Sequence, residues 1–214
     1  MGGRKYIFLT IASVLALTIL GVFVLVLLPE RVLQDPELAA IPESIDEPVI
    51  TFIDPIRGSE DAKITIVEYG DFACPLCQNI EPDIATLIAE APRQRRLIWK
   101  DAPNVAIHPE AFTLAQAARC GQDQGKFWEF HDQLLSSSLN PNASQLRTIA
   151  ENLGMDGETF AACMASGVTR PIVEHTLDEA VALDIASTPA IFINGVLYDG
   201  PLTLNSLREY IEAL

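Results

Sequence analysis

The stretch ITIVEYGDFACPLC, residues 64–77, joins a predicted strand to a predicted helix. Its first part, Ile64 to Tyr69, is apolar and β-branched, which is typical of a buried strand, and the residues after Cys77 are typical of a helix. Two cysteines at this spacing and at such a junction face each other closely enough to close a small disulfide ring. The helix N-terminus also favours a thiolate at Cys74. The stretch therefore predicts a reactive, reversible redox pair.

Two other uses of this cysteine spacing compete with the redox pair. A zinc site needs four ligands, usually a second cysteine pair or paired histidines. This chain adds only Cys120 and Cys163, far apart, and three scattered histidines. A purely structural disulfide in so short a ring would close little chain and stabilise little. Both uses are disfavoured, and we expect neither a metal nor a cofactor.

An apolar segment stands near the beginning of the chain. Residues 6–28 contain no charge and follow Arg4 and Lys5. A helix of this length would span a hydrocarbon core of about 30 Å. A cleaved signal peptide would have a shorter apolar region and a small-x-small cleavage site, and that alternative stays open. We expect residues 1–29 to be a cytoplasmic tip and transmembrane anchor, which the positive-inside tendency orients with everything after Pro29 outside the cytoplasm.

The chain beyond the apolar segment is strongly acidic. All 29 acidic residues and 12 of the 14 basic ones lie there, so its formal charge is near −17. This disfavours nucleic acid as a partner, because nucleic acid requires basic patches, and it disfavours docking on anionic lipid. The acidity is more typical of a solubility feature. Four cysteines are compatible with two disulfides in an oxidising compartment, so we expect an extracytoplasmic domain, periplasmic or on the outer face.

Hydrophobic periodicity and turn residues predict an α/β chain with a helical block in its middle. Residues 30–58 are rich in proline and acidic residues, which is typical of a linker. A first strand is expected in the apolar patch at residues 49–53. Further strands are expected at residues 63–69, 96–100, 190–194 and 196–198, and helices at residues 78–91, 109–122, 126–135, 144–153, 157–165, 170–183 and 205–214.

Several separated motifs together resemble the thioredoxin superfamily, and within it the membrane-anchored, DsbA-like thiol:disulfide oxidoreductases. They are VEYGDF before the cysteine pair, Pro82 after it, AARC with GKFWE in the helical block, and STPAIFING near the end. The resemblance covers the chain from about Gly58 onward and implies a thioredoxin fold with an inserted α-helical domain. The expected division is a linker at residues 30–58, a thioredoxin-like domain at residues 59–107 and 169–214, and a helical insertion at residues 108–168.

The resemblance implies roles for the residues around the cysteine pair. Cys74 would be the exposed attacking cysteine with a lowered pKa, and Cys77 the buried resolving cysteine. Pro75 would fix the backbone at the first helical position, where its missing N–H costs nothing. Glu68 would point inward beneath the pair and shuttle the proton of Cys77. The alternative for Glu68 is a strand residue that faces solvent.

Two further features follow from the resemblance. Thr188-Pro189 matches the family's cis-proline loop, which packs against the cysteine pair and leaves the Thr188 backbone free to bind an extended substrate strand; an ordinary trans turn proline is the alternative. Cys120 and Cys163 would either form a structural disulfide within the insertion or stay free as small buried residues. An oxidising compartment favours the disulfide.

The implied activity is thiol–disulfide exchange on reduced or unfolded exported polypeptides, with disulfide formation as the favoured direction and a quinone-linked, DsbB-like membrane partner as reoxidant. A reductase or isomerase kept reduced by a membrane partner would use the same residues. A redox-inactive peptide-binding module on the same fold is a further alternative. Leu76 lacks the charge and hydrogen bond that a histidine would add between the cysteines, so we expect a milder oxidant than the strongest family members. The histidines His108, His131 and His175 are expected to be structural.

Overall fold

The computed structural model describes residues 41–136 and 141–214. These described residues belong to one compact unit. The membrane span expected at residues 6–28 lies outside the described residues, and no helix within them has the length and apolar character needed to cross a membrane. The expected division into anchor, linker, thioredoxin-like parts and insertion stays a prediction.

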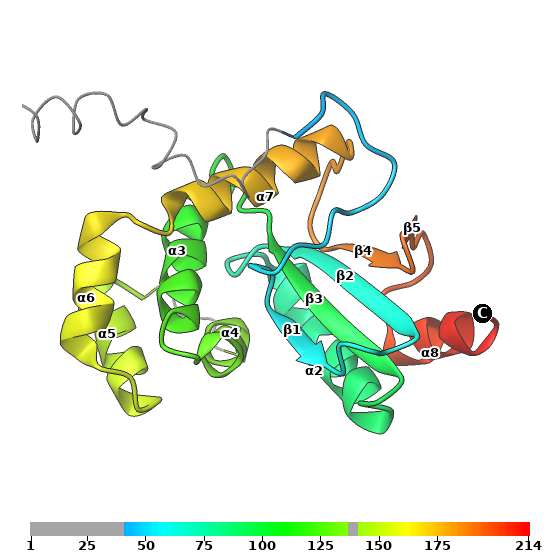
Figure 1. Ribbon diagram of the computed structural model, residues 1–214, viewed down its shortest axis with the longest axis horizontal. Helices are drawn as coiled ribbons and strands as arrows, with labels where there is room; N and C mark the ends of the chain where they lie inside the picture. Colours follow the sequence, from blue (N-terminus) through cyan, green and yellow to red (C-terminus); the bar gives the residue numbers. More distant parts are fainter. Residues whose placement is uncertain (1–40, 137–140) are drawn as a thin grey trace, which may run out of the picture. The chain divides into compact units, whose positions relative to one another are not determined.

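A five-stranded mixed sheet forms the centre of the fold (Figure 1). The strand order is β1-β3-β2-β4-β5, in which β2 and β3 run parallel and every other neighbouring pair is antiparallel. The parallel pair β2 and β3 lies in the middle and is buried along most of its length, as parallel strands require. The strands are β1 Ile56–Gly58, β2 Ile64–Gly70, β3 Arg95–Asp101, β4 Ala190–Ile193 and β5 Val196–Leu197.

The first strand lies later than the sequence predicts. Residues 49–53 are not a strand, because buried side chains take the backbone groups that a strand would pair. Val49 donates its N–H to Glu179 at 2.8 Å and accepts from the Lys100 ammonium at 2.6 Å. Asp54 then closes a turn by accepting from the Thr51 N–H at 2.7 Å. The expected strand at residues 49–53 is therefore wrong, and Ile56–Gly58 takes its place at the sheet edge.

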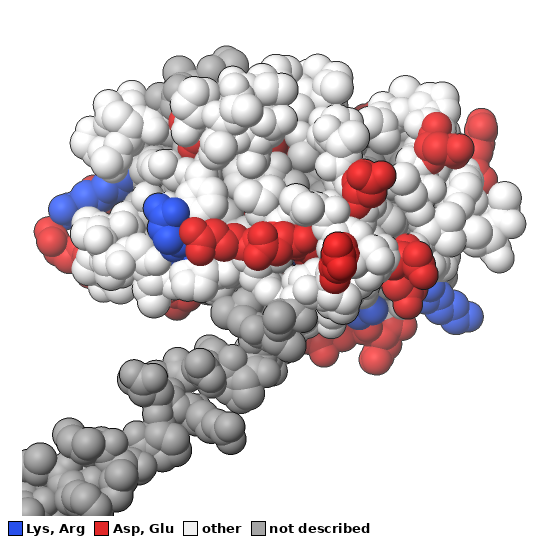
Figure 2. Space-filling model, turned by 90° about the horizontal axis from the view of Figure 1, so that it is seen from above, with Lys and Arg blue, Asp and Glu red and all other residues white. Residues whose placement is uncertain are grey.

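Different helices cover the two faces of the sheet. Successive residues of a strand point to opposite faces. Ile66 of β2 therefore packs with α2 (Pro75–Glu90) and α8 (Leu204–Glu212), whereas Val67 packs with α7 (Arg170–Ala182) on the other face. Figure 2 views the molecule from the side that carries α7, where acidic side chains outnumber basic ones. This view agrees with the formal charge of −15 for the whole chain.

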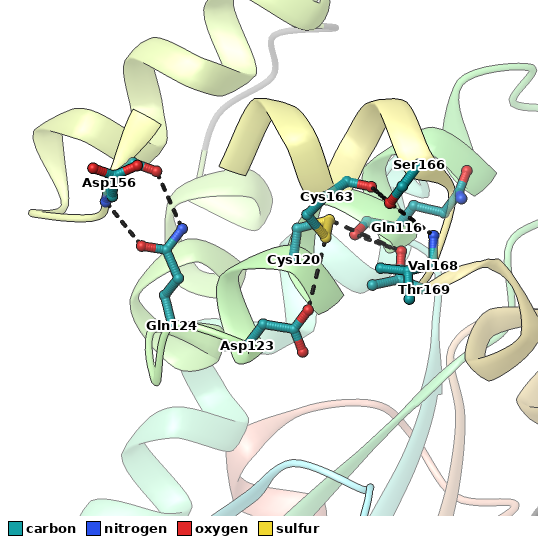
Figure 3. The surroundings of a disulfide bond; sticks show 9 residues. All are labelled: Gln116, Cys120, Asp123, Gln124, Asp156, Cys163, Ser166, Val168 and Thr169. Atoms are coloured by element: carbon teal, nitrogen blue, oxygen red, sulfur yellow. Dashed lines mark hydrogen bonds between the residues drawn. A yellow bond between two sulfur atoms is a disulfide. The ribbon is translucent and has the colours of Figure 1, made fainter. Parts of the chain in front are cut away.

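The helical block between β3 and α7 (Figure 1) has its own apolar core. The core is built from small alanines and large aromatic residues, and it extends to the cysteine pair at the start of α2. A disulfide between Cys120 of α3 and Cys163 of α6 ties two of the helices, with Cα atoms 5.9 Å apart (Figure 3). The helices of the block are α3 Ala111–Gln122, α4 Phe127–Ser136, α5 Ala143–Asn152 and α6 Gly157–Ser166.

We expect the Cys120–Cys163 disulfide to contribute measurably to stability. Its partners are 43 residues apart in sequence, and in the chain-entropy model a loop of that length contributes about 4 kcal/mol. The double variant Cys120→Ala/Cys163→Ala should therefore lose about 2–4 kcal/mol of unfolding free energy. Chemical denaturation under non-reducing conditions measures the loss.

The matched control for this measurement is Cys74→Ala/Cys77→Ala, because a disulfide between Cys74 and Cys77 would close a far shorter loop. Its effect on the unfolding free energy should be clearly smaller. If removing the Cys120–Cys163 bond left the unfolding free energy unchanged, the stabilising role of this disulfide would be wrong.

Candidate active site

The two cysteines of the CxxC motif lie at the N-terminus of α2. Cys74 is the N-cap residue with an extended backbone, Pro75 is the first helical residue, and Cys77 lies in the first turn. Both thiols are free. The helix thus begins three residues earlier than the sequence predicts, because proline at the first helical position lacks only an N–H that would have no partner in the helix.

Cys74 is less accessible than the sequence predicts. Its exposed fraction is 6%, and that of Cys77 is 0%. The Cys74 Sγ lies 3.5 Å from the backbone oxygen of Thr188, so the loop that precedes β4 covers it. The expectation of an exposed Cys74 is therefore wrong, because this residue is buried. A substrate sulfur must pass the covering loop to reach Cys74, on the side of Leu76, which is 58% exposed.

The two thiols have opposite acidities. A hydrogen bond from Cys77 lowers the pKa of Cys74 to about 5 against the opposing effect of burial, and the backbone N–H groups of Cys77 and Leu76 with the Thr188 side chain lower it further. The same hydrogen bond, together with burial and the nearby Glu68, raises the pKa of Cys77. At neutral pH Cys74 is therefore a thiolate and Cys77 a thiol.

Glu68 is a buried acid beneath the cysteine pair. It lies on β2 and faces the same side as Ile66, because alternate strand residues share a face, so its side chain points toward α2. It is fully buried, and neither carboxylate oxygen has a hydrogen-bond partner within residues 41–136 and 141–214. Burial first, then the charges of Glu81 and Cys74, raise the pKa of Glu68 well above its usual range. A neutral carboxyl group avoids the cost of an unpaired buried charge.

A second buried acid, Glu81, lies one turn beyond Cys77 on α2. Burial raises the pKa of Glu81 to about 8, although the nearby Arg57 opposes the shift. The carboxylate is 3.5 Å from the Arg57 guanidinium and 3.8 Å from Nδ1 of His131. Glu81 is therefore a second buried carboxyl group close enough to Glu68 for its charge to raise the pKa of Glu68.

Three side chains could together hold a metal ion, because their ligand-type atoms lie within 4.8 Å of one another: Glu81, His131 and Asp132. However, the Arg57 guanidinium contacts Asp132 at 2.6 Å and Glu81 at 3.5 Å. It also stacks over the Trp128 ring, 4.3 Å from its centroid. This cation already balances the carboxylates, so the cluster fits an ion-paired network better than a metal centre.

The segment between β2 and α2 contributes a further acid, Asp71, which is 1% exposed. Its carboxylate accepts from the backbone N–H groups of Ala73 at 2.8 Å and Asn104 at 3.1 Å. It also contacts Nδ1 of His108 at 2.8 Å. The Asp71 N–H in turn donates to the Cys77 Sγ at 3.5 Å. The structure therefore brings His108, which the sequence suggests is merely structural, to the edge of the cysteine pair.

The Thr188-Pro189 peptide bond is cis, and both residues are half-buried beside Cys74. A groove of about 230 Å³ runs along this loop. The exposed apolar side chains of Val105 and Val181 flank it, from the β3–α3 connection and from α7. An extended chain could therefore lie against the loop with its side chains on an apolar surface.

A family model described as thioredoxin matches residues 52–213. Among curated relatives, the Na(+)/H(+) antiporter NhaA 1 of Salinispora arenicola is 34% identical over 160 residues, which are 75% of this chain and 24% of that protein. The NhaA antiporter of Herminiimonas arsenicoxydans is 29% identical over 211 residues, 99% of this chain and 33% of that protein. The chain thus spans about a quarter to a third of the length of these relatives.

Solved structures show the same fold. BdbD from Bacillus subtilis superposes with a TM-score of 0.70 at 22% identity, covering 79% of this chain and 96% of that one. The thiol-disulfide exchange protein alpha-DsbA2 from Wolbachia pipientis has a TM-score of 0.67 at 23% identity, covering 76% of this chain and 87% of that one. Because the family model covers well over half of the sequence, the chain belongs to the thioredoxin family.

Proposed function

We propose that the protein catalyses thiol–disulfide exchange on exported polypeptides through Cys74 and Cys77. The observation that carries this proposal is the opposite acidity of the two thiols: Cys74 has a pKa of about 5 at a helix N-terminus, and Cys77 is a buried thiol of raised pKa. A low-pKa thiolate is both a good nucleophile at neutral pH and a good leaving group.

In the favoured direction the oxidised pair accepts two electrons from a substrate dithiol. A substrate thiolate attacks the Cys74 sulfur, which forms a mixed disulfide and breaks the Cys74–Cys77 bond. Cys77 leaves with the electron pair and takes up a proton. The second substrate thiolate then attacks the substrate sulfur of the mixed disulfide and releases Cys74 as a thiolate, which its lowered pKa keeps stable at neutral pH.

Glu68 is the proposed proton carrier for Cys77. Its raised pKa favours the protonated form, which can donate a proton when Cys77 leaves, and the ionised form can accept one when Cys77 attacks. The charge of Glu68 raises the pKa of Cys77, which agrees with this proximity. Pro75 serves the same chemistry by fixing the start of α2 at the attacking sulfur.

The cis-proline loop is the proposed substrate-binding element. Thr188 and Pro189 lie over Cys74, and the adjacent groove is apolar and open. An extended, unfolded segment can pair its backbone with such a loop while apolar side chains contact the groove. Reduced or unfolded polypeptides offer both features, whereas folded proteins hide them.

The solved structures similar to this chain include a thioredoxin-like oxidoreductase from Silicibacter pomeroyi, with a TM-score of 0.68 at 23% identity over 76% of this chain and 92% of that one. The alpha-DsbA2 protein is a thiol-disulfide exchange protein. These similarities support the proposed chemistry in either direction. The antiporter names belong to proteins several times longer than this chain.

For the direction we propose disulfide formation in an extracytoplasmic compartment, with a quinone-linked, DsbB-like membrane protein as reoxidant. An anchor at residues 6–28 would confine both proteins to one membrane surface and raise their effective concentration without new contacts. Reduction or isomerisation, with a membrane partner that keeps the pair reduced, is the opposite direction through the same residues.

The assignment of the two sulfurs predicts a trapped intermediate. Cys77→Ser removes the resolving thiol, so substrates should accumulate as mixed disulfides with Cys74. Nonreducing electrophoresis followed by mass spectrometry identifies the linkage. Cys74→Ser is the control and should form no adducts and lose insulin-reduction activity. Adducts on Cys120 or Cys163, or equal inertness of wild type and Cys74→Ser, would contradict the assignment.

Glu68→Gln keeps the shape of the side chain but removes its exchangeable proton. We expect the rate of the step in which Cys77 leaves or attacks to fall roughly 10²-fold, at the low end for general acid–base catalysis. Stopped-flow tryptophan fluorescence measures this rate. Glu174→Gln, an exposed change on α7, is the control. A rate equal to that of wild type would exclude Glu68 as the proton carrier.

The same variant should change the pH dependence of stability. The raised pKa of Glu68 means that the folded state holds this proton above the usual range of a carboxyl group. Stability from this group is therefore lost as pH rises from the ordinary pKa toward the folded value. Glu68→Gln should remove that loss and flatten the stability curve at pH values above the ordinary pKa of a carboxyl group, as measured by chemical denaturation over a series of pH values.

The direction of electron flow can be read from the redox state of Cys74 and Cys77 in intact cells. Acid quenching followed by thiol alkylation preserves this state, and Cys74→Ser/Cys77→Ser marks the background from the other cysteines. We expect a mostly oxidised pair at steady state. A mostly reduced pair would contradict the oxidase direction and favour the reductase or isomerase.

A further inference from the structure

The CxxC motif of this chain lacks a charged partner for its thiolate, because Leu76 carries neither charge nor a hydrogen-bond donor on its side chain. A nearby buried carboxylate disfavours the thiolate of Cys74 further. Asp71 is 1% exposed, and its carboxylate accepts from the N–H of Ala73, the residue before Cys74, at 2.8 Å. A negative charge in that position opposes a thiolate at the neighbouring Cys74.

His108 is placed to balance this charge. Its Nδ1 lies 2.8 Å from the Asp71 carboxylate, and its side chain is 19% exposed, so it can exchange protons with solvent. It reaches the site from the β3–α3 connection, whose backbone also donates to Asp71 through Asn104. The imidazole is thus held by an anchored carboxylate rather than by a mobile surface group.

We propose that His108, held by Asp71, is a positioning residue that adds to the stability that hydrogen bonds give the Cys74 thiolate, in place of a charged residue within the CxxC motif. The inference rests on the proposed function, because it concerns how oxidising the Cys74–Cys77 pair is. With His108 protonated, the Asp71 charge is balanced and the thiolate is favoured. With His108 neutral, the thiolate stands beside an unbalanced buried carboxylate.

The charges that face His108 all favour its protonated form. The hydrogen bond to Asp71 raises the pKa of His108 against the effect of burial, and the charges of Asp71, Cys74 and Glu110 raise it further. Asp71 comes from the β2–α2 segment, Cys74 from the N-cap of α2, and Glu110 from the residues before α3. Residues 185–189 of the neighbouring cis-proline loop carry no ionisable side chain.

Linkage fixes the sign of the effect. If protonated His108 stabilises the Cys74 thiolate, the thiolate must raise the pKa of His108 equally. The imidazole should therefore titrate at a higher pH in the reduced protein than in the oxidised one, where the disulfide carries no charge. As pH rises through the pKa of His108, the pair should become less oxidising, because the reduced form loses its support.

The test compares His108→Gln, which removes the charge, with His108→Lys, which keeps it. In the full-length reduced protein we expect His108→Gln to raise the pKa of Cys74 by roughly half to one unit, since the site is partly screened by solvent. The glutathione equilibrium should become about three- to tenfold less oxidising. Thiolate absorbance gives the pKa, and alkylation in glutathione buffers gives the equilibrium.

The charge of the side chain at residue 108, rather than its shape, should determine the pKa of Cys74 in these variants. His108→Lys should stay closer to wild type than His108→Gln does. Asp71→Asn/His108→Gln should recover part of the loss, because it removes both the unbalanced carboxylate and its partner. His175→Gln on α7 is the matched control and should leave the Cys74 pKa unchanged.

Three results would overturn the inference. The first is an unchanged Cys74 pKa in His108→Gln, and the second is equal shifts in His108→Gln and His108→Lys, which would indicate a purely structural role. The third is equal imidazole pKa values in the two redox states, which proton NMR of the His108 ring measures independently. If the wild-type pair failed to equilibrate with glutathione, the proposed function would fail, and the thiolate titration would still decide the role of His108.

Discussion

The chemistry proposed for this protein depends on one asymmetric hydrogen bond, in which the Cys77 thiol donates to the Cys74 thiolate at the N-terminus of α2. It divides two chemically identical side chains into a nucleophile and a resolving thiol. The rest of the site maintains that difference. Backbone N–H groups and Thr188 support the charge on Cys74, while burial and Glu68 keep the proton on Cys77.

The sheet places these groups by its two-residue period. Glu68 shares the α2 face of β2 with Ile66, whereas Tyr69 points to the opposite face and donates to Glu179 at 2.6 Å. There Lys100 lies 2.9 Å from Glu179 and 2.8 Å from Asp54 in a fully buried ionic network. Tyr69, which contacts the paired charges on one face, and Glu68, the acid without a hydrogen-bond partner on the other face, are neighbouring residues of β2. Of these two residues, Glu68 is the one whose charge acts on Cys77.

Sequence alone predicts most of the fold because strongly periodic segments leave little choice. The strands and helices lie within a few residues of their expected bounds, and Asp156 caps α6 by accepting from Thr159 at 2.7 Å. The patch at residues 49–53 misleads because its apolar side chains resemble a strand. Its backbone partners, Glu179 and Lys100, are distant in sequence.

The residues of the candidate site also differ in how well the sequence predicts their positions. Cys74, Cys77 and Pro75 are readable from local spacing, since the strand–helix junction itself determines their positions. The burial of Cys74 is not, because the covering Thr188 lies 114 residues away. The contact between His108 and Asp71 joins residues 37 apart in sequence, with helix α2 and strand β3 between them. The sequence does show an acid, Asp71, shortly before the CxxC motif and a histidine, His108, after the next strand. Neither residue indicates a contact with the other until the fold is known.

The central claim, that Cys74 and Cys77 form a reversible two-electron couple, is tested most directly by equilibrating the full-length protein with glutathione buffers and counting alkylated thiols. We predict a single transition that Cys74→Ser abolishes. Its midpoint should lie between about −120 mV and about −270 mV, the values of a strong oxidant and a reductant on this fold. A pair that stayed in one redox state across the whole range would contradict the claim.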